Sequence, residues 1–261
     1  MKNLSRMEEA MLTAERKGSV VVATLSRPPV NALNDDMVRR LHAVLDDVLA
    51  DDGITVLHLR SDQKIFCAGA DLALMQACFA TPEGPDHMVE VVREMQRLFF
   101  RIASAPVVSV AELGGTAMGG GMELALACDV RVAASEAKLG LPEARLGLLP
   151  GAGGTQRLTA LCGAGTANRL ILGAEIIDGA EAERLGIVQW ARPRAEVAGW
   201  AAEVVSRFAT IPRAAIAANK RCIAAVQDAG QDGYAEEISG TRRLYDHPET
   251  RRRVSEFLSK N

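Results

Sequence analysis

The stretch GGTAMGGGMELALACD, residues 114–129, decides the fold prediction. It joins a turn and three consecutive glycines to a short apolar run that contains one carboxylate, Glu123. Glycine has no Cβ, so another group can approach the backbone closely. The first amides of the following helix have no partner inside it, and the helix dipole favours negative charge there. The stretch therefore predicts hydrogen-bond donors for a developing oxyanion. The alternative is that the glycines only allow close packing between elements and that Glu123 is a surface residue of the first helical turn.

Two common phosphate-binding motifs do not fit this stretch. A nucleotide P-loop needs Lys-Ser or Lys-Thr after its glycines, and Met122 and Glu123 stand there instead. The Gly-x-Gly-x-x-Gly spacing of a dinucleotide site is also missing.

The composition narrows the class of protein. The chain has 261 residues, 48% of them apolar, and a net charge of −3, which gives no basic field for nucleic acid or an anionic membrane. Five scattered cysteines and four distant histidines show no metal-ligand spacing and no disulfide framework. The first 18 residues are mixed and charged, and no run of 18 apolar residues exists. We therefore expect a cytoplasmic protein without metal, and its alanine- and arginine-rich composition points to a bacterium.

Strands and helices alternate in the first part of the chain. Buried strands are expected at 19–25, 54–60, 106–111 and 130–134, with helices at 36–50 and 86–104 between them. This order predicts an α/β layer. Beyond about residue 163 the sequence becomes helical and rich in alanine.

Several short segments, in this order, carry a resemblance to a known family. They are Arg27-Pro28 with Asn31-Ala32-Leu33, Phe66 to Leu72, Met118 to Ala125, Asp129, Leu141-Pro142-Glu143 and Gly147 to Leu158. Together they resemble the crotonase superfamily, the enoyl-CoA hydratase/isomerase family, from about Ser19 to at least Val226.

The resemblance implies a fold and an assembly. We expect a crotonase-like ββα spiral core that holds the active site at residues 1–195. A helical C-terminal region at 196–261 would serve oligomerisation and cover the active site. A homotrimer or a hexamer, as a dimer of trimers, is implied, and coenzyme A would enter as part of an acyl-CoA substrate with no separate cofactor.

The resemblance also implies site residues. The amides of Ala68 and Gly120 would form the oxyanion hole for the thioester carbonyl, and Glu123 and Glu143 would be the two catalytic carboxylates. The expected contacts to the coenzyme A thioester are Ala68, Gly69, Ala70, Asp71, Leu72 and Gly120, with Pro28 and Ala32 near its adenine end. From sequence alone, Asp71 is equally well a helix cap. The segment 72–92 is expected to set the acyl chain length.

The chemistry explains the two acids. Adding water to a trans-2-enoyl thioester creates an enolate oxygen, which two backbone donors can stabilise. Water must lose a proton at C3 while C2 receives one, and two carboxylates on one face can do both. We expect Glu143 to handle the C2 proton and Glu123 to position and activate the water. The predicted function is 2-enoyl-CoA hydratase, as in fatty acid β-oxidation.

Alternatives remain open. A Δ3,Δ2-enoyl-CoA isomerase would need only one of the acids, and an aromatic enoyl-CoA hydratase/lyase would keep both. One branch of the family binds AU-rich RNA, but this chain shows no aromatic-basic interleaving. The cluster Arg251-Arg252-Arg253 suits either phosphate contacts or a solvated helix face. Phe257 and Lys260 stand where family hydratases place a tail that reaches a neighbouring subunit's coenzyme.

Overall fold

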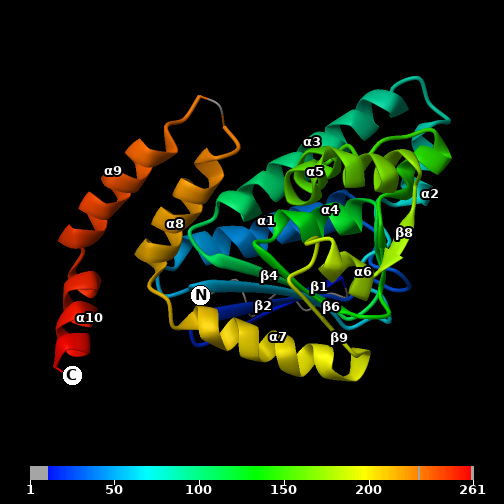
Figure 1. Cartoon of the computed structure of the whole chain (residues 1–261). Coiled ribbons are helices and arrows are strands. Elements are labelled where there is room, and N and C mark those ends of the chain that lie inside the picture. The colour runs from blue at the N-terminus through cyan, green and yellow to red at the C-terminus, as the bar shows by residue number, and fades with distance from the viewer. Residues whose placement is uncertain (1–10, 229, 260–261) are drawn as a thin grey trace.

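A six-stranded sheet forms the centre of the molecule (Figure 1). The computed structural model describes residues 11–228 and 230–259. The strand order is β1-β2-β3-β4-β6-β9; β1 runs antiparallel to β2, and the other neighbours are parallel. The strands are β1 (Leu12–Lys17), β2 (Val20–Leu25), β3 (Val56–Ser61), β4 (Val108–Leu113), β6 (Val130–Ala134) and β9 (Trp190–Arg192). The four strands expected from sequence are confirmed.

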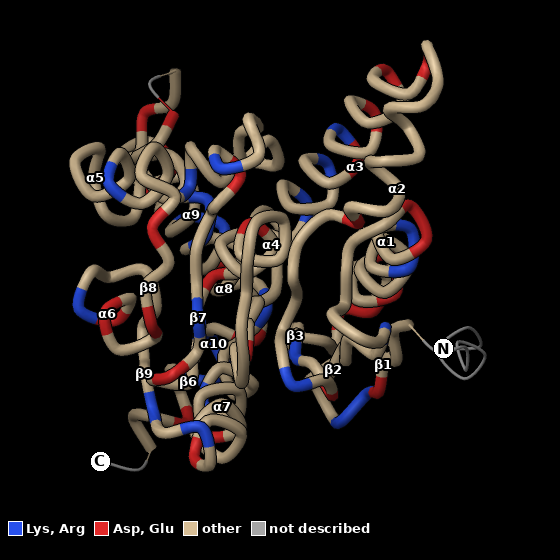
Figure 2. Tube along the Cα trace, turned by 90° about the vertical axis from the view of Figure 1, so that its right-hand side faces the viewer, with Lys and Arg blue, Asp and Glu red and all other residues tan. Residues whose placement is uncertain are grey.

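Helices cover both faces of this sheet. Helices α1 (Asp35–Ala50), α3 (Gly84–Ser104) and α4 (Gly120–Ala127) lie on one face, and α7 (Arg194–Ala209) lies on the other (Figure 1). Every residue of β2 is buried, as expected for a strand covered on both sides. Acidic and basic residues are interspersed along the outer helix α3 (Figure 2), and Arg97 pairs with Glu90. The charge therefore lies outside, and the apolar layers lie next to the sheet.

Short elements on the side of α4 complete the core. A second sheet, ordered β5-β7-β8, consists of β5 (Ala117–Met118), β7 (Lys138–Gly140) and β8 (Ile176–Asp178). The remaining core helices are α2 (Leu72–Cys78), the 3₁₀ helix η2 (Pro142–Leu146), α5 (Gly154–Leu172) and α6 (Gly179–Arg184). Helix α5 contains a non-helical Gly163, at which its two halves meet.

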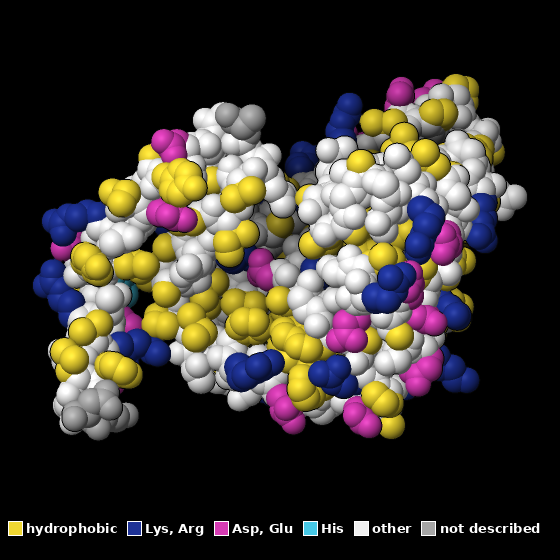
Figure 3. Space-filling view, in the orientation of Figure 1, with side chains coloured by type: hydrophobic (Ala, Val, Ile, Leu, Met, Phe, Trp, Pro, Cys, Tyr) yellow, Lys and Arg dark blue, Asp and Glu magenta, His cyan; other side chains and the backbone are white. Residues whose placement is uncertain are grey.

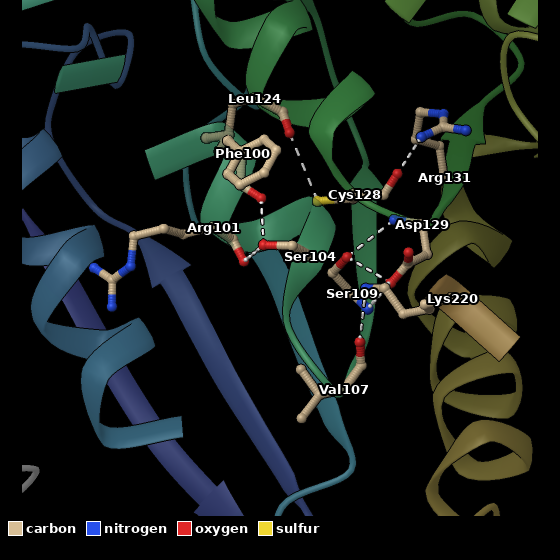
Figure 4. Close-up of polar contacts among 10 residues, drawn as sticks. All are labelled: Phe100, Arg101, Ser104, Val107, Ser109, Leu124, Cys128, Asp129, Arg131 and Lys220. Carbon is tan, nitrogen blue, oxygen red and sulfur yellow. Dashed lines mark hydrogen bonds and ion pairs between the residues drawn. The ribbon is translucent and has the colours of Figure 1, made fainter. Parts of the chain in front are cut away.

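A buried arginine holds the C-terminal end of α4. Arg131 is 2% exposed, and its guanidinium donates to the carbonyl oxygens of Cys128 (2.6 Å), Ala125 (3.2 Å) and Ile187 (2.7 Å). The contact with Cys128 is drawn in Figure 4. The last carbonyls of a helix lack partners and carry negative partial charge. Arg131 therefore fixes α4 from the end opposite its glycine run.

A polar cluster ties the next helix, α8 (Arg213–Ala225), to the sheet (Figure 4). Lys220 donates to Asp129 Oδ2 (2.7 Å) and to the Val107 carbonyl (3.0 Å). The same carboxylate oxygen accepts hydrogen bonds from the Ser109 amide (2.7 Å) and hydroxyl (2.9 Å). Asp129, one of the residues that carried the family resemblance, therefore has a structural role here.

The last two helices, α9 (Gly233–Asp246) and α10 (Pro248–Leu258), extend from α8 on the side of the molecule away from α2 (Figure 1). Val197, Ala201 and Val204 of α7 and Ile216 of α8 belong to the main hydrophobic core, so α9 and α10 form the projecting part. The division of the chain at residue 195 stays a prediction. Lys260 lies outside the described residues. Within residues 11–228 and 230–259, none of the helices has the length and apolarity needed to span a membrane.

Candidate active site

Two loops meet at the N-terminal end of α4. One leaves β3 through Cys67 to Ala70, and the other enters α4 through Met118 and Gly119; a bridge between Cys67 and Ala117 holds them side by side. Gly69 has φ 104°, and a Cβ there would lie 2.9 Å from the Met118 carbonyl oxygen and 3.2 Å from the Gly120 nitrogen. Only glycine combines this backbone angle with so close an approach. The glycines therefore bring two sets of backbone amides together.

The free amides in this region belong to Ala70 and Gly120. Among the hydrogen bonds of the described residues, neither nitrogen has an acceptor. The Cβ position of Gly120 is 3.5 Å from the Ala70 nitrogen, so the two amides are neighbours. The Ala68 amide instead donates to the Val30 carbonyl oxygen at 3.0 Å. This bond contradicts the prediction that Ala68 supplies a free oxyanion donor; the residue two positions later fits that role.

Glu123 is held inside the protein from the first turn of α4. It is 3% exposed, and its Oε1 accepts a hydrogen bond from the Gly154 amide at 2.8 Å. Burial raises the pKa of Glu123 to about 7, and the charge of Glu143 adds to this rise, while the Gly154 bond and the Arg157 guanidinium oppose it. The alternative of a surface glutamate is therefore excluded. A carboxyl group with this pKa can accept or release a proton near neutral pH.

Glu143 reaches the same place from η2. A Cβ on Gly119 would lie 3.0 Å from Glu143 Oε1, so this carboxylate lies against the first residues of α4. Its Oε2 is buried and has no hydrogen-bond partner among the described residues. Burial raises the pKa of Glu143 above its usual range. The two carboxyl groups are therefore both held at the N-terminal end of α4 with raised pKa values.

A cavity of about 670 Å³ opens in front of these groups. Ala70, Gly120, Glu123 and Glu143 all line it, and its outer walls come from α2, α3 and the segment 146–152. The size lies in the range of small-molecule sites, and apolar walls with a few convergent polar groups are typical of them. The arrangement can hold a carbonyl oxygen at the amides beside two acid/base groups.

The other predicted contacts divide into two groups. Ala68, Gly69 and Leu72 line the cavity, whereas Asp71, Pro28 and Ala32 do not belong to its lining. The Asp71 carboxylate caps α2 by accepting from the Ala73 amide, and it pairs with Arg27 at 2.6 Å. Arg27 also donates to the Ala32 carbonyl oxygen at 2.7 Å, so the loop 28–32 lies against the start of α2. The adenine contact of Pro28 and Ala32 stays a prediction.

Two features of the site were missed from sequence. The Gly154 amide, which holds Glu123, lies 31 positions away, and no local pattern predicts the pairing. The free amide of Ala70 was named only as a coenzyme contact. Glycine with a positive φ immediately before it is the signal that the chain turns there, but that angle becomes visible only in the structure.

Known proteins share this fold. The family model described as enoyl-CoA hydratase/isomerase matches residues 15–261. A Bacillus subtilis protein named probable enoyl-CoA hydratase is 39% identical over 191 residues, which cover 73% of this chain and 72% of that protein. The solved structure of an enoyl-CoA hydratase from Geobacillus kaustophilus superimposes with a TM-score of 0.91 at 30% identity, covering 98% of this chain and 96% of that one. The chain belongs to the enoyl-CoA hydratase/isomerase family and has the crotonase fold.

A human relative bears a more specific name. Mitochondrial methylglutaconyl-CoA hydratase is 38% identical over 189 residues, which cover 72% of this chain but 54% of the human protein. The chain therefore spans about half the length of the mammalian relatives it matches.

Proposed function

We propose that the protein hydrates trans-2-enoyl-CoA thioesters to 3-hydroxyacyl-CoA, with no cofactor beyond the coenzyme A of the substrate. The observation that carries the proposal is the convergence of two buried glutamates with two free amides at one end of one cavity. The names of the bacterial relatives support the same reaction.

The proposed oxyanion donors are the amides of Ala70 and Gly120. They would donate hydrogen bonds to the thioester carbonyl oxygen as it becomes an enolate oxygen during attack at C3. Each such donor contributes roughly 3 kcal/mol of transition-state stabilisation. The two amides are already oriented by the loops around Gly69, so little reorganisation accompanies charge development.

The two glutamates would divide the proton transfers. Glu123 would take a proton from the attacking water, because it lines the cavity and the Gly154 amide fixes its Oε1. Glu143 would give a proton to C2, since its Oε2 has no other partner among the described residues. The proton lost by water at Glu123 and the proton given by Glu143 balance, and exchange between the pair restores the starting state.

The first test follows loss of the conjugated thioester absorbance when the purified protein meets crotonyl-CoA. Glu123→Gln and Glu143→Gln are each expected to lose about 10²–10⁴-fold in kcat, the usual contribution of a general acid or base. Glu203→Gln, at an exposed position on α7, is the matched control and should keep full activity. Full hydration by either site variant would refute the two-carboxylate proposal. Isomerisation of a 3-enoyl-CoA without hydration would favour the isomerase.

We propose further that the chain assembles as a homotrimer or hexamer. Large apolar side chains are exposed on the projecting helices, where hydrophobic atoms gather at the left of Figure 3. They include Tyr234 (83%), Ile238 (74%) and Phe257 (69%). Contact with a second copy would bury them. In this role α9 and α10 could cover a neighbour's active site, because among the described residues none of 196–259 lines the cavity of its own chain.

Sedimentation of the wild type and of Ile238→Asp tests this assembly. We expect a trimer or hexamer for the wild type and its dissociation in the variant; a monomeric wild type would refute the proposed assembly.

We place the protein in a bacterial cytoplasm. All five cysteines are free thiols, which accords with a reducing compartment.

A further inference from the structure

The cavity beyond the two glutamates is lined by hydrocarbon. Its walls come from α2, from α3 and from the segment that follows η2. The side chains are Met75 and Phe79, Val89 and Val92, and Leu146 and Leu149. Phe79, Leu146 and Leu149 are 65%, 62% and 69% exposed although they face this cavity. Apolar side chains left open around a cavity that already holds the polar groups at one end call for an apolar occupant.

The far part of the cavity offers no unpaired cation. Among the described residues that line it, Arg93 is the single basic side chain. Its guanidinium already pairs with the Glu90 carboxylate at 3.1 Å, and its side chain is 64% exposed to solvent. The nearby amide of Gln96 donates to the Gly151 carbonyl oxygen at 2.6 Å. A second carboxylate at the end of an acyl chain would therefore enter an apolar wall without a partner, which is unfavourable.

We infer that the site takes 2-enoyl thioesters whose acyl chain is an uncharged hydrocarbon longer than four carbons. This inference rests on the proposed hydratase function and names its substrate class. A four-carbon crotonyl group ends close to the reacting carbons and leaves the apolar walls uncovered. Each further methylene that becomes buried against them is expected to raise kcat/KM about fourfold.

The flexible lining supports chains of different length. Met75 and Met88 both line the cavity, and methionine adapts its shape more readily than branched side chains. Terminal carboxylates are disfavoured for the reason given above. A site built for a glutaconyl group would need a partner for its terminal carboxylate, and this cavity wall is apolar instead.

A substrate series tests the inference directly. We would measure kcat/KM for crotonyl-CoA, trans-2-octenoyl-CoA, trans-2-pentenoyl-CoA and glutaconyl-CoA; the last two have five carbons each and differ in the terminal carboxylate. Octenoyl-CoA should exceed crotonyl-CoA at least tenfold, and pentenoyl-CoA should exceed glutaconyl-CoA at least tenfold. Equal or better use of glutaconyl-CoA, or no gain from four to eight carbons, would overturn the inference. If the protein hydrates none of the four substrates, the proposed function itself is refuted.

A charge placed in the wall provides the second test. Val89 lines the cavity from α3 and is 48% exposed, so lysine can be accommodated there. Val89→Lys should lower the octenoyl-to-crotonyl ratio of kcat/KM at least tenfold and raise the glutaconyl-to-pentenoyl ratio. Phe100→Lys, three turns further along α3 and outside the cavity lining, is the matched control and should change none of these ratios. An unchanged octenoyl-to-crotonyl ratio in Val89→Lys would contradict the inference, and urea unfolding of the variant checks that it is folded.

Discussion

The backbone amide of Gly154 donates a 2.8 Å hydrogen bond to Oε1 of Glu123, and this bond joins the first turn of α5 to the first turn of α4. A Cβ at position 154 would lie 2.9 Å from Oε1 and 2.8 Å from the Pro150 side chain. The space between the two helices therefore admits the carboxylate only when residue 154 has no side chain.

Gly154→Ala is expected to displace the Glu123 carboxylate and lower kcat for enoyl-CoA hydration about 100-fold, because small misplacements of a catalytic group have large kinetic effects. Gly165→Ala in the same helix is the control. A Cβ there meets nothing within 4 Å, so this change should keep full activity and stabilise the helix by about 0.5–1 kcal/mol. Equal activities of the two variants would show that the position of Glu123 is not critical.

Removing one N–H at a time distinguishes whether the amide of Ala70 or that of Ala68 is the oxyanion donor. Replacing the alanine by its α-hydroxy acid converts the amide into an ester. At position 70 this should lower kcat/KM about 10²–10³-fold. The free energy of unfolding should change little, since that N–H has no acceptor among the described residues.

The same replacement at position 68 is the matched comparison. It removes the hydrogen bond to the Val30 carbonyl oxygen, so the free energy of unfolding should fall by about 1 kcal/mol while kcat/KM stays near the wild-type value. The reverse pattern would restore Ala68 as the donor.

The difference between these two alanines shows where sequence reasoning reaches its limit. The pattern of residues 66–72 located a loop that lines the cavity. Which amide remains free depends on the turn at Gly69 and on a hydrogen bond to Val30, 38 positions earlier in the chain. A contact between distant segments leaves no periodic signal in the sequence.

In the fold, too, some strands were predictable from the sequence and others were not. The strands expected at 19–25 and 130–134 are continuous apolar or alternating runs, and the structure has them at Val20–Leu25 and Val130–Ala134. The edge strand β1, with sequence LTAERK, was missed because four of its six residues are exposed and carry polar side chains typical of a loop. β5 has two residues and β7 and β8 have three each, which is too short for periodicity to emerge.

The raised pKa of Glu123 predicts how stability depends on pH. Its pKa is about 7 in the folded protein and is expected near the ordinary value of 4.5 in the unfolded chain. The folded state therefore binds more protons between these values, and stability must fall as pH rises from about 4.5 to 7. At pH 8 the ionised Glu123 therefore lowers the free energy of unfolding by about 3 kcal/mol relative to low pH.

Glu123→Gln removes that titration. Measured by urea unfolding, the variant should gain stability relative to the wild type as pH is raised from 5 to 8, by about 2–3 kcal/mol, although it has lost activity. Glu203→Gln, on the exposed side of α7, should follow the wild-type curve. A constant difference between Glu123→Gln and the wild type across this range would show that Glu123 has an ordinary pKa.

The last prediction concerns Arg131, which holds α4 from its C-terminal end. Its guanidinium is almost fully buried and satisfies three carbonyl oxygens, those of Ala125, Cys128 and Ile187. Arg131→Met fills a similar volume but leaves these acceptors without their donor, so the free energy of unfolding should fall by about 3 kcal/mol. Arg39→Met, at a position whose side chain is 71% exposed and whose ion pair is with Asp36 on the same helix, should change it by less than about 0.5 kcal/mol. Since Arg131 also fixes the direction of α4, its loss should lower kcat more than it raises KM; a stable and fully active Arg131→Met would show that the N-terminal contacts of α4 position Glu123 without it.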